Sequence, residues 1–408
     1  MKITSWGNTS SKYIKHVNKI DRSVLDYGNL NSYGDSCIPI FDETLKIESE
    51  QKNSNMTIGD FVQRNKQLLA GIPGKSNVTL AGAVASDVHG KDSGWNGSFI
   101  NNIESLKVII PNGEIVFCDR NNNQDLFFTT VGGFGLTGTI QKVVLRNLNL
   151  NYSSKFLSST KKGTGLTNLL DNFTNKHSEY SVAWIDLLSA NRNWVLNISK
   201  PMKNSHANKE VKFKNYKESS LSLPFFGSNV LNTMGFLNFA FYNFTNNNSK
   251  EIKNIKDVLF PLSYISNTKN IASKRKIIQV QFSIPEENKK HLHRLIDILV
   301  YKQTPLLCSL KKLGPAETNL NLSFVQTGWT IAVDFAARNF DHREIRNFYK
   351  ELISFGGMVY LAKDSTLNKE EFHKMFLNFS NWKNVVKKID PDKKYQSMMS
   401  SRLGIKDW

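Results

Sequence analysis

The stretch that most constrains this chain runs from Gly71 to Gly90 and reads GIPGKSNVTLAGAVASDVHG. Its apolar middle, Val78 to Val88, has mostly small residues: Ala81, Gly82, Ala83, Ala85 and Ser86. A buried strand or helix ordinarily carries Leu, Ile or Phe to fill volume. Small side chains instead let another backbone or a ligand approach the main chain, with amide groups free to face a phosphate. The stretch therefore predicts tight packing of two chain segments or a site where a phosphate-bearing ligand lies against peptide groups.

Composition places the chain among globular proteins. It has 408 residues, of which 40% are hydrophobic and 22% charged, so one or two domains are expected. The cysteines, Cys37, Cys118 and Cys308, are odd in number and far apart, which excludes a disulfide framework. No run approaches the roughly 18 apolar residues of a membrane span, and the start of the chain has no apolar leader. We therefore expect a cytoplasmic protein, with peripheral contact at the inner face of the membrane as an alternative.

The charge balance favours anionic partners. Lys and Arg number 53 against 35 Asp and Glu, a formal net charge of +18. Such an excess attracts nucleic acid, anionic headgroups or phosphorylated substrates, although it also fits a lysine-coated surface without a dedicated partner. No Arg-rich arm, helix-turn-helix or aromatic RNA-binding strand is present. A nucleic-acid partner is therefore not expected.

Three patterns do not support the sites that they suggest at first sight. Gly133 to Gly138 fits GxGxxG, but Thr139 to Leu145 alternates like a strand where a nicotinamide-binding unit needs a helix. The segment before Lys75-Ser76 lacks the first glycine of a phosphate-binding loop, because Leu69 occupies that position. The eight histidines show no metal-ligand spacing, so no metal site is predicted.

A series of motifs, in this order and spacing, carries a family resemblance over nearly the whole chain. The motifs are Trp6-Gly7, Ser32-Tyr33-Gly34-Asp35, the block from Pro73 to Lys91, Gly97-Ser98-Phe99, Thr130 to Gly138, Ala183-Trp184 with Asp186, Gly328-Trp329, and Tyr360 with Ala362 to Ser365. Together they resemble the flavin-dependent oxidases of the vanillyl-alcohol-oxidase superfamily, and among these the oxidases of a polyprenylphosphoryl ribose. The resemblance implies an α+β, two-domain PCMH-type fold. Residues 1–152 and 358–408 would form the FAD-binding domain, with a shortened N-terminal subdomain, and residues 153–357 an antiparallel-sheet cap domain that binds substrate.

The resemblance also implies the residues that contact FAD. They are Gly28, Asn31, Ser32, Tyr33, Gly34, Pro73, Gly74, Thr79, Gly82, Ala83, Ser86, Asp87, His89, Gly90, Ile140 and Tyr360. Many members attach the flavin through a histidine at the position that Asn31 occupies here, so a non-covalent flavin is expected. Because the segment between Trp6-Gly7 and Ser32-Tyr33 is shorter than in those members, a binding protein without flavin stays open as an alternative.

The second half of the chain predicts a regular β-α-β-β-α-β unit without help from the family. Alternation or a helical apolar stripe marks, in order, a strand at 276–284, a helix after Pro285, strands at 305–311 and 328–335, a helix at 342–355 and a strand at 358–362. Such an order gives an antiparallel sheet with its helices on one side. The other face is then free for solvent or for a ligand.

That free face carries polar residues. From the sequence pattern alone, a surface exposed to solvent explains them as well as a ligand-binding surface does. Gln279, Gln281, Thr330 and Lys311 fall on it, opposite Ile331, Val333 and Phe335. In the family this face covers the reacting ring of the flavin. The resemblance therefore implies a set of substrate contacts: Trp184, Gln279, Gln281, Lys311, Thr330, Ala332 and Lys363.

The resemblance implies oxidation of the 2′-hydroxyl of a polyprenylphosphoryl pentose, with a separate NAD(P)-dependent short-chain reductase completing an epimerisation. Lys363 and Tyr33 are the expected catalytic residues. Lys363 would steady negative charge on the ring or, with a lowered pKa, take the hydroxyl proton. A soluble sugar or aldonolactone oxidase on the same fold is the alternative.

Near the end of the chain, Asn368 and Glu371 predict a capping box. The stripe Phe372, Met375, Phe376 and Phe379 predicts one amphipathic helix. Core packing is its expected role, with docking on a membrane surface as the alternative.

Overall fold

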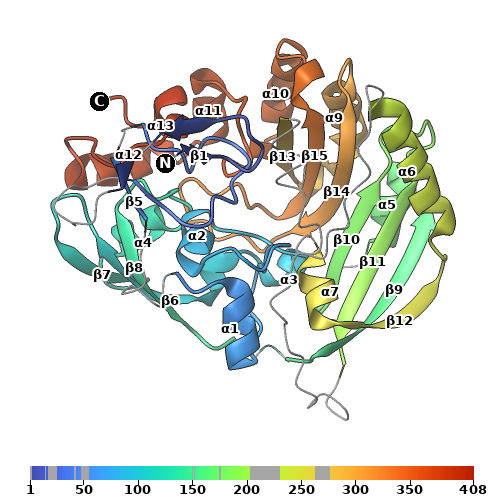
Figure 1. Cartoon of the computed structure of the whole chain (residues 1–408), viewed down its shortest axis with the longest axis horizontal. Helices are drawn as coiled ribbons and strands as arrows, with labels where there is room; N and C mark the ends of the chain where they lie inside the picture. The colour runs from blue at the N-terminus through green and yellow to red at the C-terminus, as the bar shows by residue number, and fades with distance from the viewer. Residues whose placement is uncertain are drawn as a thin grey trace.

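The computed structural model describes residues 2–13, 15–16, 25–40, 43–46, 55–148, 150, 152–173, 176–202, 230–261 and 276–408. It combines helices with sheets that are antiparallel except for one short parallel sheet near the start of the chain, which confirms the predicted α+β class. In Figure 1 both chain ends lie on one side, beside a three-stranded sheet, and an eight-stranded sheet occupies the other side. Segments 203–229 and 262–275, which belong to the predicted cap domain, lie outside the described residues.

The large sheet consists of two β-α-β-β-α-β units placed edge to edge. The strand order is β12-β9-β11-β10-β14-β15-β13-β16, so the two units are related by a pseudo-twofold between β10 and β14. The first unit comprises β9 (Lys155–Gly163), α5 (Leu166–Asn172), β10 (Tyr180–Ile185), β11 (Trp194–Pro201), α6 (Val230–Phe244) and β12 (Ser249–Asn254). The second comprises β13 (Ile277–Pro285), α9 (Leu292–Val300), β14 (Pro305–Leu313), β15 (Gly328–Ala336), α10 (Glu344–Ser354) and β16 (Met358–Val359).

The second unit is the one that the sequence predicted, and its alternation is confirmed. Ile278, Val280 and Phe282 lie in the core, where α9 and α10 cover the sheet. Two details differ. The last strand is limited to Met358–Val359, because the backbone turns at Tyr360, and a 3-10 turn, Glu286–His291, precedes α9.

The first part of the chain forms a smaller antiparallel sheet with short helices. The sheet order is β7-β6-β8, and β8 directly follows the GxGxxG pattern, which confirms that this pattern does not open a helix. The elements are β6 (Ile103–Ile109), β7 (Ile115–Asp119), β8 (Thr139–Leu145), α1 (Ile58–Asn65), α2 (Leu80–Ala85), α3 (Ser93–Asn96), η2 (Phe99–Asn102) and α4 (Gln124–Thr130). Short strands precede them: β1 (Lys2–Thr4), β2 (Ser11–Tyr13), β3 (Lys15–His16), β4 (Asp26–Tyr27) and β5 (Glu43–Lys46).

The C-terminal helices are α11 (Lys369–Met375), α12 (Phe379–Ile389) and α13 (Met398–Arg402). The predicted capping box at Asn368 is present. Of the predicted stripe, Phe372 and Met375 lie in α11, Phe376 is the residue that caps its end, and Phe379 begins α12, so the expectation of one helix is wrong. All four stripe residues are buried in the core, which confirms core packing and excludes membrane docking by this stripe.

Two hydrophobic clusters cross the predicted domain boundary. One joins the large sheet to α11–α13 and to Phe134 and Leu136. The other joins the small sheet and α2 to Phe156 of β9 and to α7 (Ile255–Leu259). The division into two domains therefore stays a prediction. Among the described residues, no helix is both long enough and apolar enough to cross a membrane.

Candidate functional site

A cavity of about 280 Å³ lies where the first part of the chain meets the free face of the large sheet. Its walls come from the loop at residues 28–37, from α2 and the loops at its ends, from the start of β8, and from β13, β14, β15 and residues 360–363. Most of the cofactor residues implied by the resemblance line it: Gly28, Asn31, Ser32, Tyr33, Pro73, Gly74, Thr79, Gly82, Ser86, His89, Ile140 and Tyr360.

The small residues of α2 form one wall of this cavity. The helix begins at Thr79, whose hydroxyl accepts a hydrogen bond from the Gly82 amide at 3.1 Å. A Cβ built on Gly82 would lie 2.9 Å from the Thr79 hydroxyl, too close for an unstrained contact, but would meet no other atom within 4 Å, so that the space on the cavity side of this backbone is open. Tyr360 donates to the Ser86 carbonyl at 2.9 Å and closes the end of the wall. The stretch that lacks large side chains thus lines a cavity, and among the described residues no side chain other than that of Thr79 comes within 4 Å of a Cβ placed on Gly82.

Four of the implied cofactor residues do not line the cavity. Ala83 is fully buried in the core. A Cβ on Gly34 would overlap the carbonyl oxygen of Asp364, and one on Gly90 would lie 2.5 Å from a carboxylate oxygen of Asp92. These glycines permit close packing of chain segments, which a sequence motif does not distinguish from ligand contact.

Asp87 is the fourth of these residues and serves as a backbone anchor. Its carboxylate accepts hydrogen bonds from the Ile100 amide at 3.1 Å and from the Ser323 hydroxyl at 2.7 Å. Its φ of 39° is in the left-handed region. Asp87 therefore fixes the end of the α2 segment against the 3-10 helix Phe99–Asn102 and against the loop that carries Ser323.

Tyr33 and Lys363 meet at the sheet side of the cavity. The Lys363 ammonium nitrogen lies 4.1 Å from the centroid of the Tyr33 ring, and the Tyr33 amide donates to the Ala362 carbonyl. Burial lowers the pKa of Lys363 to about 8, although nearby Asp334 opposes the shift. Burial, reinforced by Asp334, raises the pKa of Tyr33 well above its usual value. The pair thus combines a neutral phenol with an amine that titrates near physiological pH.

Gln279 connects this pair to Asp334. Its amide donates to the Asp334 carboxylate, and burial raises the pKa of Asp334 to about 6 despite that hydrogen bond. Because both residues stand on the cavity face of neighbouring strands, they form a polar floor beside Lys363.

A second polar chain runs from Lys311 through His89 to Gln281. The Lys311 ammonium lies 3.5 Å from His89 Nδ1, and Gln281 Nε2 lies 2.8 Å from His89 Nε2. Gln281 also donates to Thr330 at 3.1 Å. Burial and the neighbouring Lys311 hold the pKa of His89 well below its usual value, and burial lowers the pKa of Lys311 to about 8. His89 is therefore neutral at physiological pH.

The structure divides the implied substrate contacts into two groups. Gln279, Gln281, Lys311, Ala332 and Lys363 line the cavity. Thr330 is buried behind Gln281 and donates to the Phe282 carbonyl, so it orients the amide and does not face the cavity. Trp184 is not among the lining residues. Its backbone pairs with that of Ser309, which does line the cavity, but the Trp184 ring packs edge-on against the ring of Phe241 in α6, with the ring centroids 4.9 Å apart.

Several lining residues were missed from the sequence, among them Asp26, Cys37, Lys75, Phe134 and Ser309. Ser309 was predictable, since it stands two residues before Lys311 on one strand and so shares its face. Cys37, Lys75 and Phe134 come from loops and Asp26 from the two-residue strand β4, and none of these segments has a periodic signal. No group of three or more possible metal-ligating side chains exists among the residues described.

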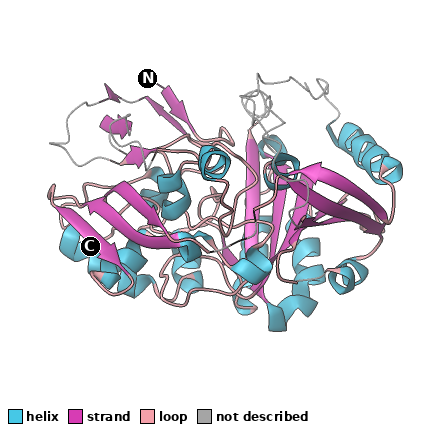
Figure 2. Ribbon diagram, turned by 90° about the horizontal axis from the view of Figure 1, so that it is seen from below, coloured by secondary structure: helices cyan, strands magenta, loops and turns pink. Residues whose placement is uncertain are grey.

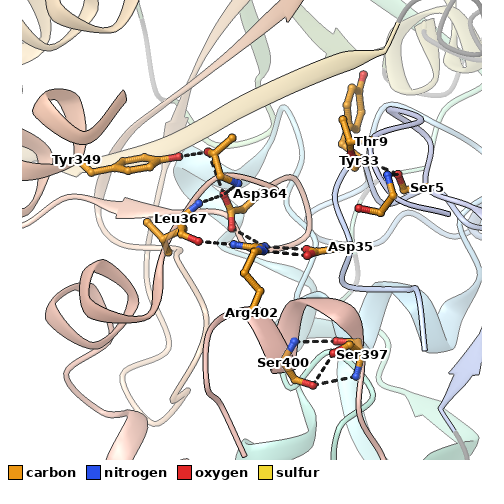
Figure 3. Close-up of polar contacts among 12 residues, drawn as sticks. Ser5, Thr9, Tyr33, Asp35, Tyr349, Asp364, Leu367, Ser397, Ser400 and Arg402 are labelled. Carbon is orange, nitrogen blue, oxygen red and sulfur yellow. Dashed lines mark hydrogen bonds and ion pairs between the residues drawn. The ribbon is translucent and has the colours of Figure 1, made fainter. Parts of the chain in front are cut away.

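One arginine fastens the segments that carry Tyr33 and Lys363 (Figure 3). Arg402 of α13 donates to both carboxylate oxygens of Asp35, at 2.8 and 2.7 Å. The same guanidinium lies 3.0 Å from a carboxylate oxygen of Asp364. Asp35 is two residues from Tyr33, and Asp364 directly follows Lys363. The ion pairs therefore position both candidate catalytic residues.

Comparison with known proteins shows that the chain is related to oxidoreductases, because its named relatives are an oxidase and several dehydrogenases. The relative with the longest reported match is decaprenylphosphoryl-β-D-ribose oxidase of Mycolicibacterium smegmatis, 28% identical over 353 residues that cover 81% of this chain and 75% of that protein. These matches confirm the resemblance predicted from the motifs.

Shorter matches cover parts of the chain. Cytokinin dehydrogenase 5 of Oryza sativa is 43% identical over 47 residues, 12% of this chain and 9% of that enzyme. An uncharacterised Streptomyces coelicolor protein is 32% identical over 120 residues, 29% of this chain and 32% of that protein. No protein-family model matches the chain.

Proposed function

We propose that this protein is an FAD-dependent oxidoreductase that oxidises the 2′-hydroxyl of a polyprenylphosphoryl pentose to a keto sugar. A separate NAD(P)-dependent short-chain reductase would then reduce the keto sugar, so that the two steps epimerise the carbon in the synthesis of a cell-envelope polysaccharide or glycolipid. The name of the long-matching relative supports this substrate class. The observation that carries the proposal is the Tyr33–Lys363 pair beside a cavity whose opposite wall is open backbone.

The residues present fit a dinucleotide cofactor. The open space at Gly82 suits the close approach of a diphosphate, and Asn31 Oδ1 is buried at the cavity with no hydrogen-bond partner among the described residues. The loop at 28–33 and the α2 wall would hold the cofactor. Asn31 replaces the attachment histidine, so binding would be non-covalent. When bound, FAD would supply hydride acceptance from the carbinol carbon of the sugar.

Lys363 is the proposed base for the sugar hydroxyl. Its lowered pKa of about 8 leaves a useful neutral fraction near pH 7, and a catalytic base works best when its pKa lies near the working pH. Tyr33, held as a neutral phenol by its raised pKa, would donate a hydrogen bond that orients the same hydroxyl. The Asp334 carboxylate would stabilise the ammonium ion of Lys363 after proton transfer.

The other end of the cavity would bind the remainder of the sugar. Gln281 and Lys311 place donors around neutral His89, and Ala332 leaves room between them. The positive side chains at the cavity suit a substrate with a phosphate group. A lipid-linked substrate also implies a peripheral position at the inner face of the membrane.

The substrate class is tested by bleaching of the flavin without oxygen. A lipid-linked phosphoryl ribose should reduce the visible absorbance of the flavin, while a free aldose and an aldonolactone should not. Bleaching by the free sugar instead would favour a soluble sugar oxidase. Colourless protein that does not take up FAD would favour a binding protein without flavin.

A further inference from the structure

Helix α6 (Val230–Phe244) is an apolar helix on the surface of a strongly charged protein. Its sequence, VLNTMGFLNFAFYNF, contains no charged residue. Phe236 is 68% exposed, Phe239 63% and Phe244 86%. Exposed aromatic side chains gathered on one element mark an interaction surface, whereas scattered ones do not.

These three rings share one side of the helix. At 100° per residue, Phe236, Phe239 and Phe244 fall within an arc of about 140°. Asn238, on the opposite side, is buried and donates to Asp186 at 2.8 Å. The helix is thus held by Asn238 and by the ring of Phe241, which packs against Trp184 of β10, and it presents Phe236, Phe239 and Phe244 outward. Figures 1 and 2 show α6 at the outer edge of the molecule.

Basic residues lie beside the carboxyl end of α6. Strands β9 and β12 pair at this edge of the sheet. On the face that α6 contacts they carry Lys162 and Lys253, the latter paired with the acid Glu251, whereas Lys155, Lys161 and Lys250 alternate to the opposite face. The Lys162 ammonium donates to the Tyr242 carbonyl at 3.0 Å, so the basic strand and the helix are in direct contact. An aromatic surface next to a net positive edge complements an anionic lipid surface, in which rings enter the interface and lysines meet headgroups.

The helix is also connected to the cavity. Phe241 packs against Trp184 of β10, and Trp184 pairs with Ser309 in the cavity wall. A partner that binds α6 therefore lies next to the strands that form the proposed substrate site.

We propose that α6 docks this protein on an anionic phospholipid bilayer, with Phe236, Phe239 and Phe244 inserted at the interface and Lys162 and Lys253, on the same face of the sheet as α6, nearest to the headgroups. The inference rests on the proposed function, because a lipid-linked substrate gives the docking its purpose. The inference goes beyond the proposed function because it names α6 as the surface that contacts the membrane, which the substrate class alone does not specify.

The test is co-sedimentation of the full-length chain with vesicles of phosphatidylcholine containing about one third phosphatidylglycerol. The triple variant Phe236→Ser/Phe239→Ser/Phe244→Ser should lower the partition coefficient at least tenfold. Phe117→Ser, which removes a ring that is 63% exposed on β7, is the matched control and should sediment like the wild type. Lys253→Gln and added salt should each weaken binding, and vesicles of phosphatidylcholine alone should bind less protein.

Wild-type protein that stays in the supernatant, or a triple variant that sediments normally, would overturn the proposal. So would a triple variant that loses only self-association on gel filtration, since α6 would then bind a second copy of the chain. If the triple variant unfolds, Phe236→Ser alone, with an expected loss of about threefold, replaces it. Bleaching of the flavin by a short-chain, water-soluble polyprenylphosphoryl ribose needs no vesicle. It therefore shows separately whether the proposed function holds.

Discussion

Replacing Arg402 with alanine should destabilise the protein by an amount that the structure lets us estimate. The guanidinium pairs with Asp35 and Asp364, which are 5% and 2% exposed. Removing the shared cation leaves two buried carboxylates without their counter-ion. Breaking a buried ion pair in this way costs about 3 to 5 kcal/mol. Because Asp35 and Asp364 adjoin the segments of Tyr33 and Lys363, the variant should also retain less flavin and be reduced more slowly.

The expected shift in melting temperature follows from the size of the chain. For 408 residues, an unfolding entropy of about 2.1 cal/mol/K per residue gives about 0.86 kcal/mol/K in total. A loss of 3 to 5 kcal/mol then lowers the melting temperature by about 4 to 6 °C. Differential scanning calorimetry measures this shift for the transition that contains the sheet and α13.

Arg294→Ala is the matched control. Arg294 pairs with Glu351 at 2.9 Å, but its side chain is 61% exposed, and a surface pair of this kind contributes at most about 1 kcal/mol. Arg402→Lys should lie between the two alanine variants, because it keeps the charge but not the two-pronged geometry. An Arg402→Ala shift no larger than that of Arg294→Ala would refute the reasoning that this clamp holds the site.

Two further predictions concern the cavity. The rate of flavin bleaching by substrate should rise with pH through about 8 and then level off, because burial lowers the pKa of Lys363 to about 8 and only its neutral form accepts a proton. A bleaching rate that falls above pH 8 would instead show that the charged form of Lys363 is needed. The Lys363→Ala protein should keep its yellow flavin but not be bleached by substrate, while the surface variant Lys374→Ala should bleach normally. Gly82→Leu should fill the space beside α2 and weaken FAD binding at least a hundredfold in a fluorescence titration. Its Cβ would lie 2.9 Å from the Thr79 hydroxyl that caps the helix, so the melting temperature should fall as well, even though leucine favours a helix over glycine by roughly 1 kcal/mol. Unchanged FAD affinity in Gly82→Leu would show that no cofactor lies against this helix.

Periodic elements were predictable because their side-chain pattern reports directly on which face is buried. The alternation from Ile278 to Phe282 identified both the core face and the cavity face of the sheet, and the register confirms it. The first β-α-β-β-α-β unit was not recognised as a repeat. Its last helix, α6, presents phenylalanines to the exterior, so its apolar residues do not report burial.

The candidate site was predictable in its outline and not in its details. Small residues at 81–86 signalled an open wall, but the same composition includes Ala83, which packs in the core. Thr330 falls on the correct face of β15, yet Gln281 stands between it and the cavity. Arg402 is distant in sequence from both of its partners, and no pattern in the chain announces such a long-range ion pair.

The central claim is that the cavity beside α2 holds a non-covalent flavin. The absorption spectrum of the purified full-length protein, recorded before and after acid precipitation, tests it most directly. The account predicts flavin bands in the native protein and, after precipitation, all of the yellow colour in the supernatant with a colourless pellet. Protein that shows no flavin bands and takes up no added FAD would contradict the claim, and a yellow pellet would contradict the non-covalent attachment.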